Sequence, residues 1–206
     1  MISTRIIKSN FQPIRFFSVT SPRMSTVSEV IAHDHRELEE YYDNILSSST
    51  EDDKVRWQNQ FTWELARHSI GEELVVYPAF EKYISDGKAM ADQDRAEHAK
   101  AKELLYTFQN LSPSQPEFES TLKQLMSELK EHIKGEEQDD MPKLEKSLPD
   151  GESASLATSF QRTKRFVPTR SHPSAPDKPP FETVAGLMAA PLDKLGDIFR
   201  RFPEDK

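Results

Sequence analysis

The sequence feature that most constrains the fold is a short phrase that occurs twice. His68-Ser-Ile-Gly-Glu72-Glu73 returns sixty-four residues later as His132-Ile-Lys-Gly-Glu136-Glu137. In each copy a histidine precedes a glutamate by four residues, which on a helix places both side chains on one face, about one 5.4 Å turn apart. Imidazole and carboxylate on one helix face are a metal-ligand arrangement. The repeat therefore predicts two helices that each supply two ligands.

Four helices are expected around these phrases, because apolar residues recur there at steps of three and four. A capping box at Thr26 and Glu29 starts the first helix, and the polar run after Ser47 ends it. The others are expected at about Asp53–Tyr77, Ala89–Leu111 and Pro116–Gln138. Pro78 is expected to end or kink the second helix. Short polar connections predict an all-α fold, an antiparallel up-down-up-down four-helix bundle.

The apolar stripe of each expected helix is interrupted at mid-length by a histidine, and in two helices also by a glutamate. By helix, these residues are His35; His68 with Glu72; His98; and His132 with Glu136. A single stripe histidine is more often a hydrogen-bonded core residue, since an unpartnered polar group in a core costs several kcal/mol. The coincidence over four helices predicts a shared metal site. His33 and His172 lie off the stripes and are predicted to bind no metal.

Composition excludes several functions. The chain has no cysteine, so thiol catalysis, disulfides and iron–sulfur ligation by its own side chains are excluded, and metal ligands must be nitrogen or oxygen. The net charge of −8 argues against nucleic-acid binding, which requires a basic face. No apolar run approaches the roughly 20 residues that span a bilayer, so no integral membrane segment is expected.

The chain divides into three expected parts. Residues 1–25 are basic and contain no acidic residue, which is typical of a mitochondrial targeting segment. The alternative is a disordered tail on a cytoplasmic or nuclear protein. Residues 26–148 form the bundle. Residues 149–206 are a proline-rich linker or arm followed by a short amphipathic helix at Thr183–Phe202, broken at Pro191. That helix is expected to pack on the bundle, or else to bind a protein partner or a membrane surface.

Residues 26–146 resemble the hemerythrin-like, HHE cation-binding domain. The resemblance lies in a first helix with one histidine, two helices with His-x-x-x-Glu, and a lone histidine on the helix between them. The extension after Ser171 is similar to tails on fungal members. The resemblance implies a four-helix bundle with two iron ions joined by an oxo or hydroxo group; zinc and manganese are the alternatives. It implies one iron on His35 and His132, the other on His68 and His98, and bridging by Glu72 and Glu136.

The sequence departs from the oxygen-carrying hemerythrins at two positions. Those proteins have a second histidine four residues after the third-helix histidine, where this chain has Lys102. They also place an aspartate five residues after the last histidine, where this chain has Glu136 at the fourth position and Glu137 at the fifth. The set is more similar to the four-His, two-Glu sites of di-iron iron–sulfur repair proteins. One missing imidazole leaves an open metal position, which favours reaction over storage of O₂.

Residues around the ligands carry further expectations. Asp94, one turn before His98, is expected to fix its ring, whereas Glu73 and Glu137 belong either beside the site or on the surface. Tyr42 and Tyr77 are expected either to hydrogen-bond near the site or to pack. The recurrence of glycine at positions 71 and 135 suggests close approach of a neighbouring helix beside the metals.

Three functions are consistent with these residues. The first is a di-iron protein that binds or turns over O₂, peroxide or nitric oxide, in iron homeostasis, iron–sulfur maintenance or stress defence; whether it is an enzyme stays open. The second is an iron-sensing or interaction module that contacts a protein partner through its C-terminal arm. The third is a structural bundle with zinc. A monomer is expected in each case.

Overall fold

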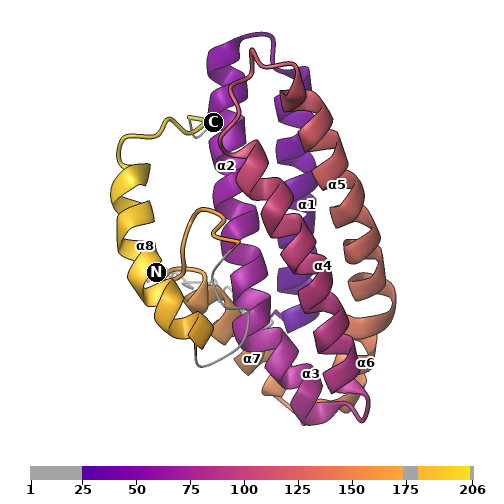
Figure 1. Cartoon of the computed structure of the whole chain (residues 1–206). Helices are drawn as coiled ribbons and strands as arrows, with labels where there is room; N and C mark the ends of the chain where they lie inside the picture. Colours follow the sequence, from indigo (N-terminus) through magenta and orange to yellow (C-terminus); the bar gives the residue numbers. More distant parts are fainter. Residues whose placement is uncertain (1–24, 174–180, 205–206) are drawn as a thin grey trace, which may run out of the picture.

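The computed structural model describes residues 25–173 and 181–204, and every regular element in these ranges is helical (Figure 1). The four longest are α1 Val27–Ser47, α2 Glu51–Gly71, α4 Gly87–Phe108 and α5 Glu117–Gly135. α1 packs against α2 and α5, and α4 packs against α5 and α2. The predicted all-α fold class is confirmed. The targeting prediction falls on residues 1–24, which lie outside the described ranges.

The N-terminal ends of α1 and α2 are capped by threonines. The predicted capping box is present, since the Thr26 N–H donates to Glu29 Oε2 at 3.0 Å and the Glu29 N–H donates to Thr26 Oγ1 at 3.1 Å. In α2 the Asp53 N–H donates to Thr50 Oγ1 at 3.1 Å, so this helix begins two residues before the expected position. Satisfying these first N–H groups is what fixes the helix starts.

Both repeated phrases run into a π-helical turn and then a short α-helix. These elements are η1 Glu72–Val76 and α3 Tyr77–Tyr83 after α2, and η2 Glu136–Asp140 and α6 Met141–Ser147 after α5. The N–H of Tyr77 donates to the carbonyl of Glu72, and that of Met141 to Glu136, across five residues instead of four. In each copy the wide turn begins at the glutamate of the phrase.

A proline directly follows each π-helical turn. In an α-helix the ring of Pro78 would clash with the carbonyl four residues earlier and leave it without a donor, and the same holds for Pro142. The wider turn relieves this conflict, so the helix continues to Tyr83. The expected end or kink at Pro78 is therefore replaced by a π turn inside a continuing helix.

The core consists of two hydrophobic clusters with a polar layer between them. The first cluster includes Leu38, Phe61, Leu105 and Leu122, and the second includes Ile31, Val76, Ala91 and Leu144. α1 and α4 pass from the second cluster to the first, whereas α2 and α5 run from the first towards the second. Each helix therefore crosses the polar layer once, near its stripe histidine.

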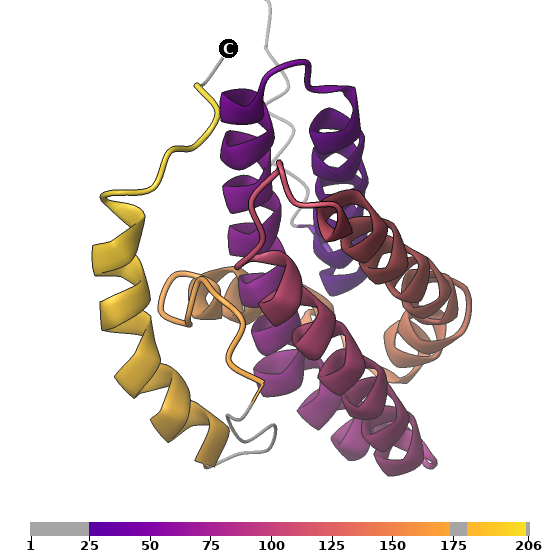
Figure 2. The ribbon, with the colours of Figure 1, turned by 45° about the horizontal axis from the view of Figure 1, so that its top comes forward.

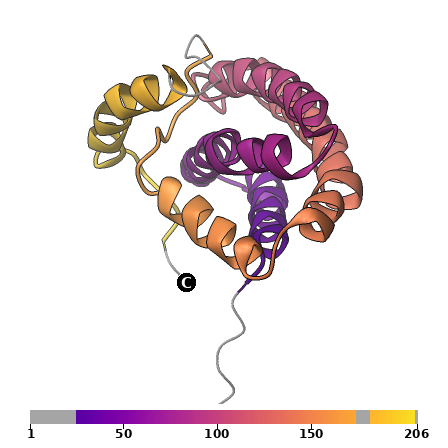
Figure 3. The ribbon, with the colours of Figure 1, turned by 90° about the horizontal axis from the view of Figure 1, so that it is seen from below.

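Part of the expected linker is a helix. Residues 152–163 of the segment predicted as a linker or arm form α7 Glu152–Thr163, which packs against α1, α2 and η1 (Figure 3). Its Phe160 is fully buried. The segment contains only a few apolar residues in a mostly polar stretch, so its composition did not indicate a helix.

The two repeated glycines differ in their surroundings. A Cβ added at Gly71 would lie 2.7 Å from Phe160 Cε2, so this glycine permits the close approach of α7. At Gly135, apart from the nearby backbone of its own helix, no atom of the described residues lies within 4 Å of the added Cβ. The expected close approach is thus found in the first copy, through α7, and not in the second.

The last helix, α8 Phe181–Asp197, lies outside the bundle beside α2 (Figures 1 and 2). It runs through Pro191, which corrects the expected break there. The following segment returns to α2, where Arg56 Nη1 donates to the Phe202 carbonyl at 2.9 Å and Asn59 Nδ2 to the Arg201 carbonyl at 2.9 Å. Within the described ranges, no helix combines the length and apolar character that a membrane crossing requires.

Candidate metal centre

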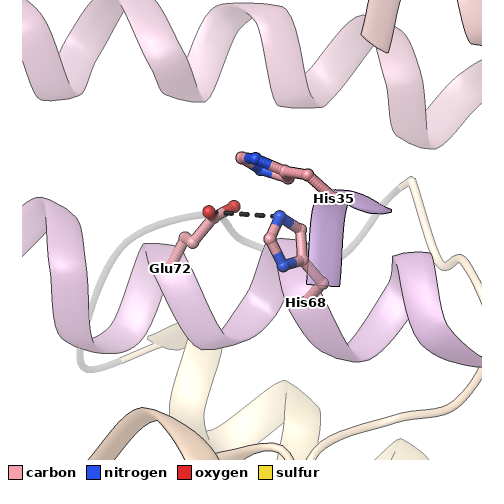
Figure 4. Close-up of side chains that lie close together, drawn as sticks. All are labelled: His35, His68 and Glu72. Atoms are coloured by element: carbon pink, nitrogen blue, oxygen red, sulfur yellow. Dashed lines mark ion pairs between the residues drawn. The ribbon is translucent and has the colours of Figure 1, made fainter. Parts of the chain in front are cut away.

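The polar layer brings the six predicted ligands together in the interior of the bundle. All six are buried, and the most exposed of them retains 7% of its surface: His35, His68, Glu72, His98, His132 and Glu136. They come from α1, α2, α4 and α5 and from the first residue of each π turn. Figure 4 shows the imidazoles of His35 and His68 close to the carboxylate of Glu72. The described residues thus place the whole predicted set in one region.

The donor atoms form two groups that share Glu72. Those of His35, His68 and Glu72 lie within 4.8 Å of one another, as do those of Glu72, His98 and His132. The ring centroids are 4.9 Å apart in the first pair of histidines and 4.7 Å apart in the second. The resemblance had implied His35 with His132 and His68 with His98. The geometry instead groups the α1 and α2 imidazoles, and separately those of α4 and α5.

Each glutamate contacts one histidine of each group. Glu72 Oε1 lies 3.1 Å from His68 Nε2, and Glu72 Oε2 lies 3.4 Å from His98 Nε2. Glu136 Oε2 lies 3.5 Å from His35 Nε2 and 3.6 Å from His132 Nε2. This placement is the one that two carboxylates spanning a pair of cations would have.

The ligand atoms themselves fit a bound metal. Within the described structure, His35 Nε2 and both carboxylate oxygens of Glu72 and of Glu136 are buried and have no hydrogen-bond partner. Buried carboxylates without partners are strongly unfavourable unless a cation or hydrogen bonds compensate them. Imidazole nitrogen and carboxylate oxygen are a donor set suited to iron, manganese or zinc. The residues present therefore fit a two-metal group.

The other ring nitrogen of each histidine is held by a carboxylate from another helical segment. The Nδ1 contacts are His35 with Glu137 at 2.8 Å, His68 with Asp34 at 3.2 Å, His98 with Glu73 at 3.2 Å, and His132 with Glu97 at 2.8 Å. A proton on Nδ1 that donates to the carboxylate leaves the Nε2 lone pair available to a metal. All four rings are therefore oriented with Nε2 towards the interior of the site.

These four carboxylates form a closed ring of contacts around the bundle. A carboxylate of α1 contacts the histidine of α2, and a carboxylate of η1 contacts the histidine of α4. A carboxylate of α4 contacts the histidine of α5, and a carboxylate of η2 contacts the histidine of α1, which closes the ring. Each carboxylate is adjacent in sequence to a ligand, in the pairs Asp34–His35, Glu72–Glu73, Glu97–His98 and Glu136–Glu137. Glu73 and Glu137 were expected either beside the site or on the surface, and the structure places both beside the site. Sequence reasoning missed Asp34 and Glu97, although their adjacency to ligands was a usable signal.

Asp94 does not hold the ring of His98, contrary to expectation. Its Oδ2 is buried with no hydrogen-bond partner in the described structure, while Glu73 occupies Nδ1 of His98. Burial, followed by the charge of Glu136, raises the pKa of Asp94 to about 8. Asp94 is close to the centre but is not part of the carboxylate ring.

The electrostatics of the site favour positive charge. Burial by itself lowers the pKa of His68, but the carboxylates of Glu72 and Asp34 outweigh it and raise that pKa to about 10. Burial likewise lowers the pKa of His132, and Glu136 and Glu97 raise it to about 9. Without a metal, protons on these imidazoles supply the positive charge that the carboxylates attract. Metal binding must therefore displace protons from the site.

Tyr77 lies beside the second group. Its hydroxyl is 2.9 Å from His98 Nε2, and its side chain is fully buried. Burial and the charges of Glu136 and Glu72 raise the pKa of Tyr77 well above its usual value, so the hydroxyl stays protonated and can donate a hydrogen bond. Tyr42 is half-buried against the first hydrophobic cluster. Of the two tyrosines, Tyr77 therefore has the polar contact and Tyr42 the packing role.

The remaining histidines lie away from the centre. The side chain of His33 is 71% exposed, next to Glu37. His172 is exposed and contacts Asp193 at 2.9 Å through Nε2. The two residues expected to be uninvolved are thus placed apart from the six ligands.

Comparisons with known proteins show which family the chain is similar to. The sequence model of the family described as "Hemerythrin HHE cation binding domain" matches residues 26–144. The chain is 54% identical over 202 residues to an uncharacterized hemerythrin-like protein of Schizosaccharomyces pombe, covering 98% of each protein. It is also 25% identical over 144 residues to a DNA nickase of Nostoc, covering 70% of this chain and 40% of that protein.

A solved structure shares the fold. The crystal structure of a hemerythrin HHE cation-binding domain-containing protein from Mycobacterium kansasii superposes with a TM-score of 0.59 at 21% identity. The match covers 69% of this chain and 86% of that one. At this level of identity the likeness concerns the helical fold alone.

Proposed function

The chain belongs to the hemerythrin HHE cation-binding family, and from this membership we propose that it holds a non-haem di-iron centre that binds or reacts with O₂, peroxide or nitric oxide. The proposed ligands are the six residues of the polar layer. The observation that carries the proposal is the position of Glu72 and Glu136, each of which contacts one histidine of each group while keeping no hydrogen-bond partner in the described structure. Two bound irons would supply redox electrons and an open coordination position for a small ligand.

The protein's own residues would control this chemistry in three ways. The carboxylate ring orients the four imidazoles, and hydrophobic clusters pack on both sides of the polar layer. The Tyr77 hydroxyl at 2.9 Å from His98 Nε2 provides a neutral hydrogen-bond donor at the second group. Lys102 stands where a fifth imidazole would complete an oxygen carrier, which supports reaction rather than storage.

Access to the centre supports chemistry over a sealed structural role. A pocket of about 390 Å³ lies between α4 and α5, and both His98 and His132 line it. Molecules the size of O₂, nitric oxide or peroxide fit such a volume readily.

Metal content tests the ligand assignment. Protein expressed in iron-replete medium is expected to contain about two irons per chain by elemental analysis, because six ligands can satisfy two cations. Glu72→Gln and Glu136→Gln should each lower that content, since each removes a proposed bridge. His33→Ala is the matched control and should retain full metal. Equal loss from His33→Ala, or zinc in place of iron in the wild-type protein, would contradict the proposal.

Spectroscopy tests the reactivity. The reduced protein should change its visible absorption on exposure to at least one of O₂, peroxide and nitric oxide, because an open metal position binds such ligands. The control is Glu72→Gln, which should respond weakly if its metal content has fallen. Wild-type protein with full iron and no response to any of the three would leave only a metal-binding module without turnover.

A further inference from the structure

A third group of possible ligands lies beside the di-iron site. The donor atoms of Asp94, Glu97 and His132 lie within 4.8 Å of one another. Asp94 and Glu97 project from one face of α4, three residues apart, and His132 faces them from α5. Two carboxylates and an imidazole are enough to hold a divalent cation with water completing its coordination.

Asp94 is the residue in this group that the fold alone does not explain. It is 4% exposed, and its Oδ2 has no hydrogen-bond partner among the described residues. An unpartnered carboxylate oxygen at this depth costs several kcal/mol. A cation bound at this position would compensate the oxygen.

Two of the three residues of the group line a pocket at the surface. The pocket between α4 and α5 is lined by Glu97 and His132, and its other acidic lining residues are Glu128 and Glu131. Lys100 also lines it, but its ammonium is paired with Glu128 at 2.7 Å. The pocket is therefore negative overall, and such a pocket raises the local concentration of cations.

His132 connects this group with the centre. Its Nδ1 is 2.8 Å from Glu97 Oε2, while its Nε2 is 3.0 Å from His98 Nε2. One ring nitrogen thus faces Glu97 and the pocket, and the other faces the proposed metals. A cation held at Asp94 and Glu97 would be separated from the centre by this single ring.

We propose that Asp94, Glu97 and His132 form a transit site, at which a divalent cation entering between α4 and α5 is held before it reaches the centre. The inference rests on the proposed function, because it requires a centre to be filled. In this role Asp94 supplies the inner carboxylate, Glu97 the outer one, and His132 the contact with the destination. The site speeds filling and is not part of the filled centre.

Loading kinetics test the transit site with Co²⁺ alone as the probe. Metal-free full-length protein is mixed with Co²⁺ in a stopped-flow instrument, and the visible absorption of protein-bound Co²⁺ is followed to completion. Asp94→Asn should load about tenfold more slowly than wild type, because it removes a carboxylate ligand from the transit site. The final amount of bound Co²⁺ in this variant should equal that of wild type.

Glu103→Gln is the matched control. Glu103 is an exposed glutamate on the same helix that lines no part of this pocket, so its loss changes the net charge equally. It should load at the wild-type rate.

The outcomes separate the two proposals. If Asp94→Asn loads as fast as wild type, the transit site is wrong while the centre stands. If this variant reaches a lower final amount, the Asp94 carboxylate belongs to the centre itself, which also overturns the transit role. Wild-type protein that binds no Co²⁺ at all would instead count against the proposed centre.

Discussion

Lys102 stands four residues after His98 on α4, on the same helix face, where a second imidazole would reach the metals. Its Nζ lies 2.5 Å from Glu73 Oε2, and Glu73 in turn contacts His98 Nδ1 through its other oxygen. The lysine therefore stabilises the carboxylate that orients the His98 ring. In the proposed centre, lysine at this position would leave one coordination position open and would also stabilise the orientation of a neighbouring ligand.

Lys102→Met tests this role. Glu73 is fully buried, so losing its lysine partner should lower the free energy of unfolding of the metal-free protein by about 3 kcal/mol. Metal affinity should fall by about tenfold, because the carboxylate that holds His98 is no longer fixed. Urea unfolding and a chelator competition titration measure the two effects.

Two further variants make the Lys102 prediction specific. Lys102→Met combined with Glu73→Gln should recover part of the lost stability, since no buried charge is then left uncompensated. Lys100→Met removes an exposed lysine two residues away on the same helix and should leave both quantities near the wild-type values. Equal losses from Lys100→Met would show that net charge, and not the contact with Glu73, is responsible.

At the residue scale, spacing along one helix predicted the ligands but not their partners. Glu72 could be placed with His68 because both lie on the same helix face. The carboxylate that orients a ring comes from another segment, so finding Asp34 or Glu97 requires knowing which helices are neighbours. Asp94 shares a face with His98, yet a shared face did not produce a contact. A position on the same helix face as a ligand was therefore a weaker guide than a position immediately next to a ligand in the sequence.

At the scale of elements, the first π turn places two consecutive glutamates in the interior. Glu72 and Glu73 are both fully buried at the start of η1, the first between the histidine groups and the second against His98. Successive residues of an α-helix point about 100° apart, which makes such a pair difficult to bury together. The helical period predicted the stripe correctly up to Glu72, but it contains no information about a turn of different width.

The two glycines give an element-scale prediction. Gly71→Ala should lower the free energy of unfolding by about 1–3 kcal/mol, because the new methyl group overlaps the ring of Phe160. Gly135→Ala should raise it by up to about 1 kcal/mol, since alanine is the better helix former and the added group meets open space. Urea unfolding of both variants measures the difference. Changes of the same sign and size in the two would contradict the assigned role of Gly71.

At the scale of the whole molecule, α7 completes the enclosure of the centre. The ring of Phe160 lies edge-on to His68, with centroids 5.9 Å apart. Lys164, just after α7, contacts both Asp34 and Glu64 in the interior. The segment that composition predicted as a linker or arm is therefore part of the core. Its position depends on long-range packing against α1 and η1, which no local pattern could reveal.

Two C-terminal substitutions should have very different effects. Phe160→Ala should lower the free energy of unfolding by about 3–5 kcal/mol, as expected for a fully buried aromatic residue. Leu195→Ser, on the 57% exposed side chain of α8, should change it by no more than about 0.5 kcal/mol. Thermal or urea unfolding compares them. A large loss from Leu195→Ser would mean that α8 is covered in solution.

In the ring of carboxylate–histidine contacts, each helical segment orients the imidazole of the next segment. This arrangement has a consequence for the assembly of the protein. A nascent or partly folded chain that lacks one docked helix has at least one ring free to rotate, so it cannot present all four Nε2 lone pairs together. If the proposed centre forms, the protein should therefore capture its metals only once the tertiary structure is complete.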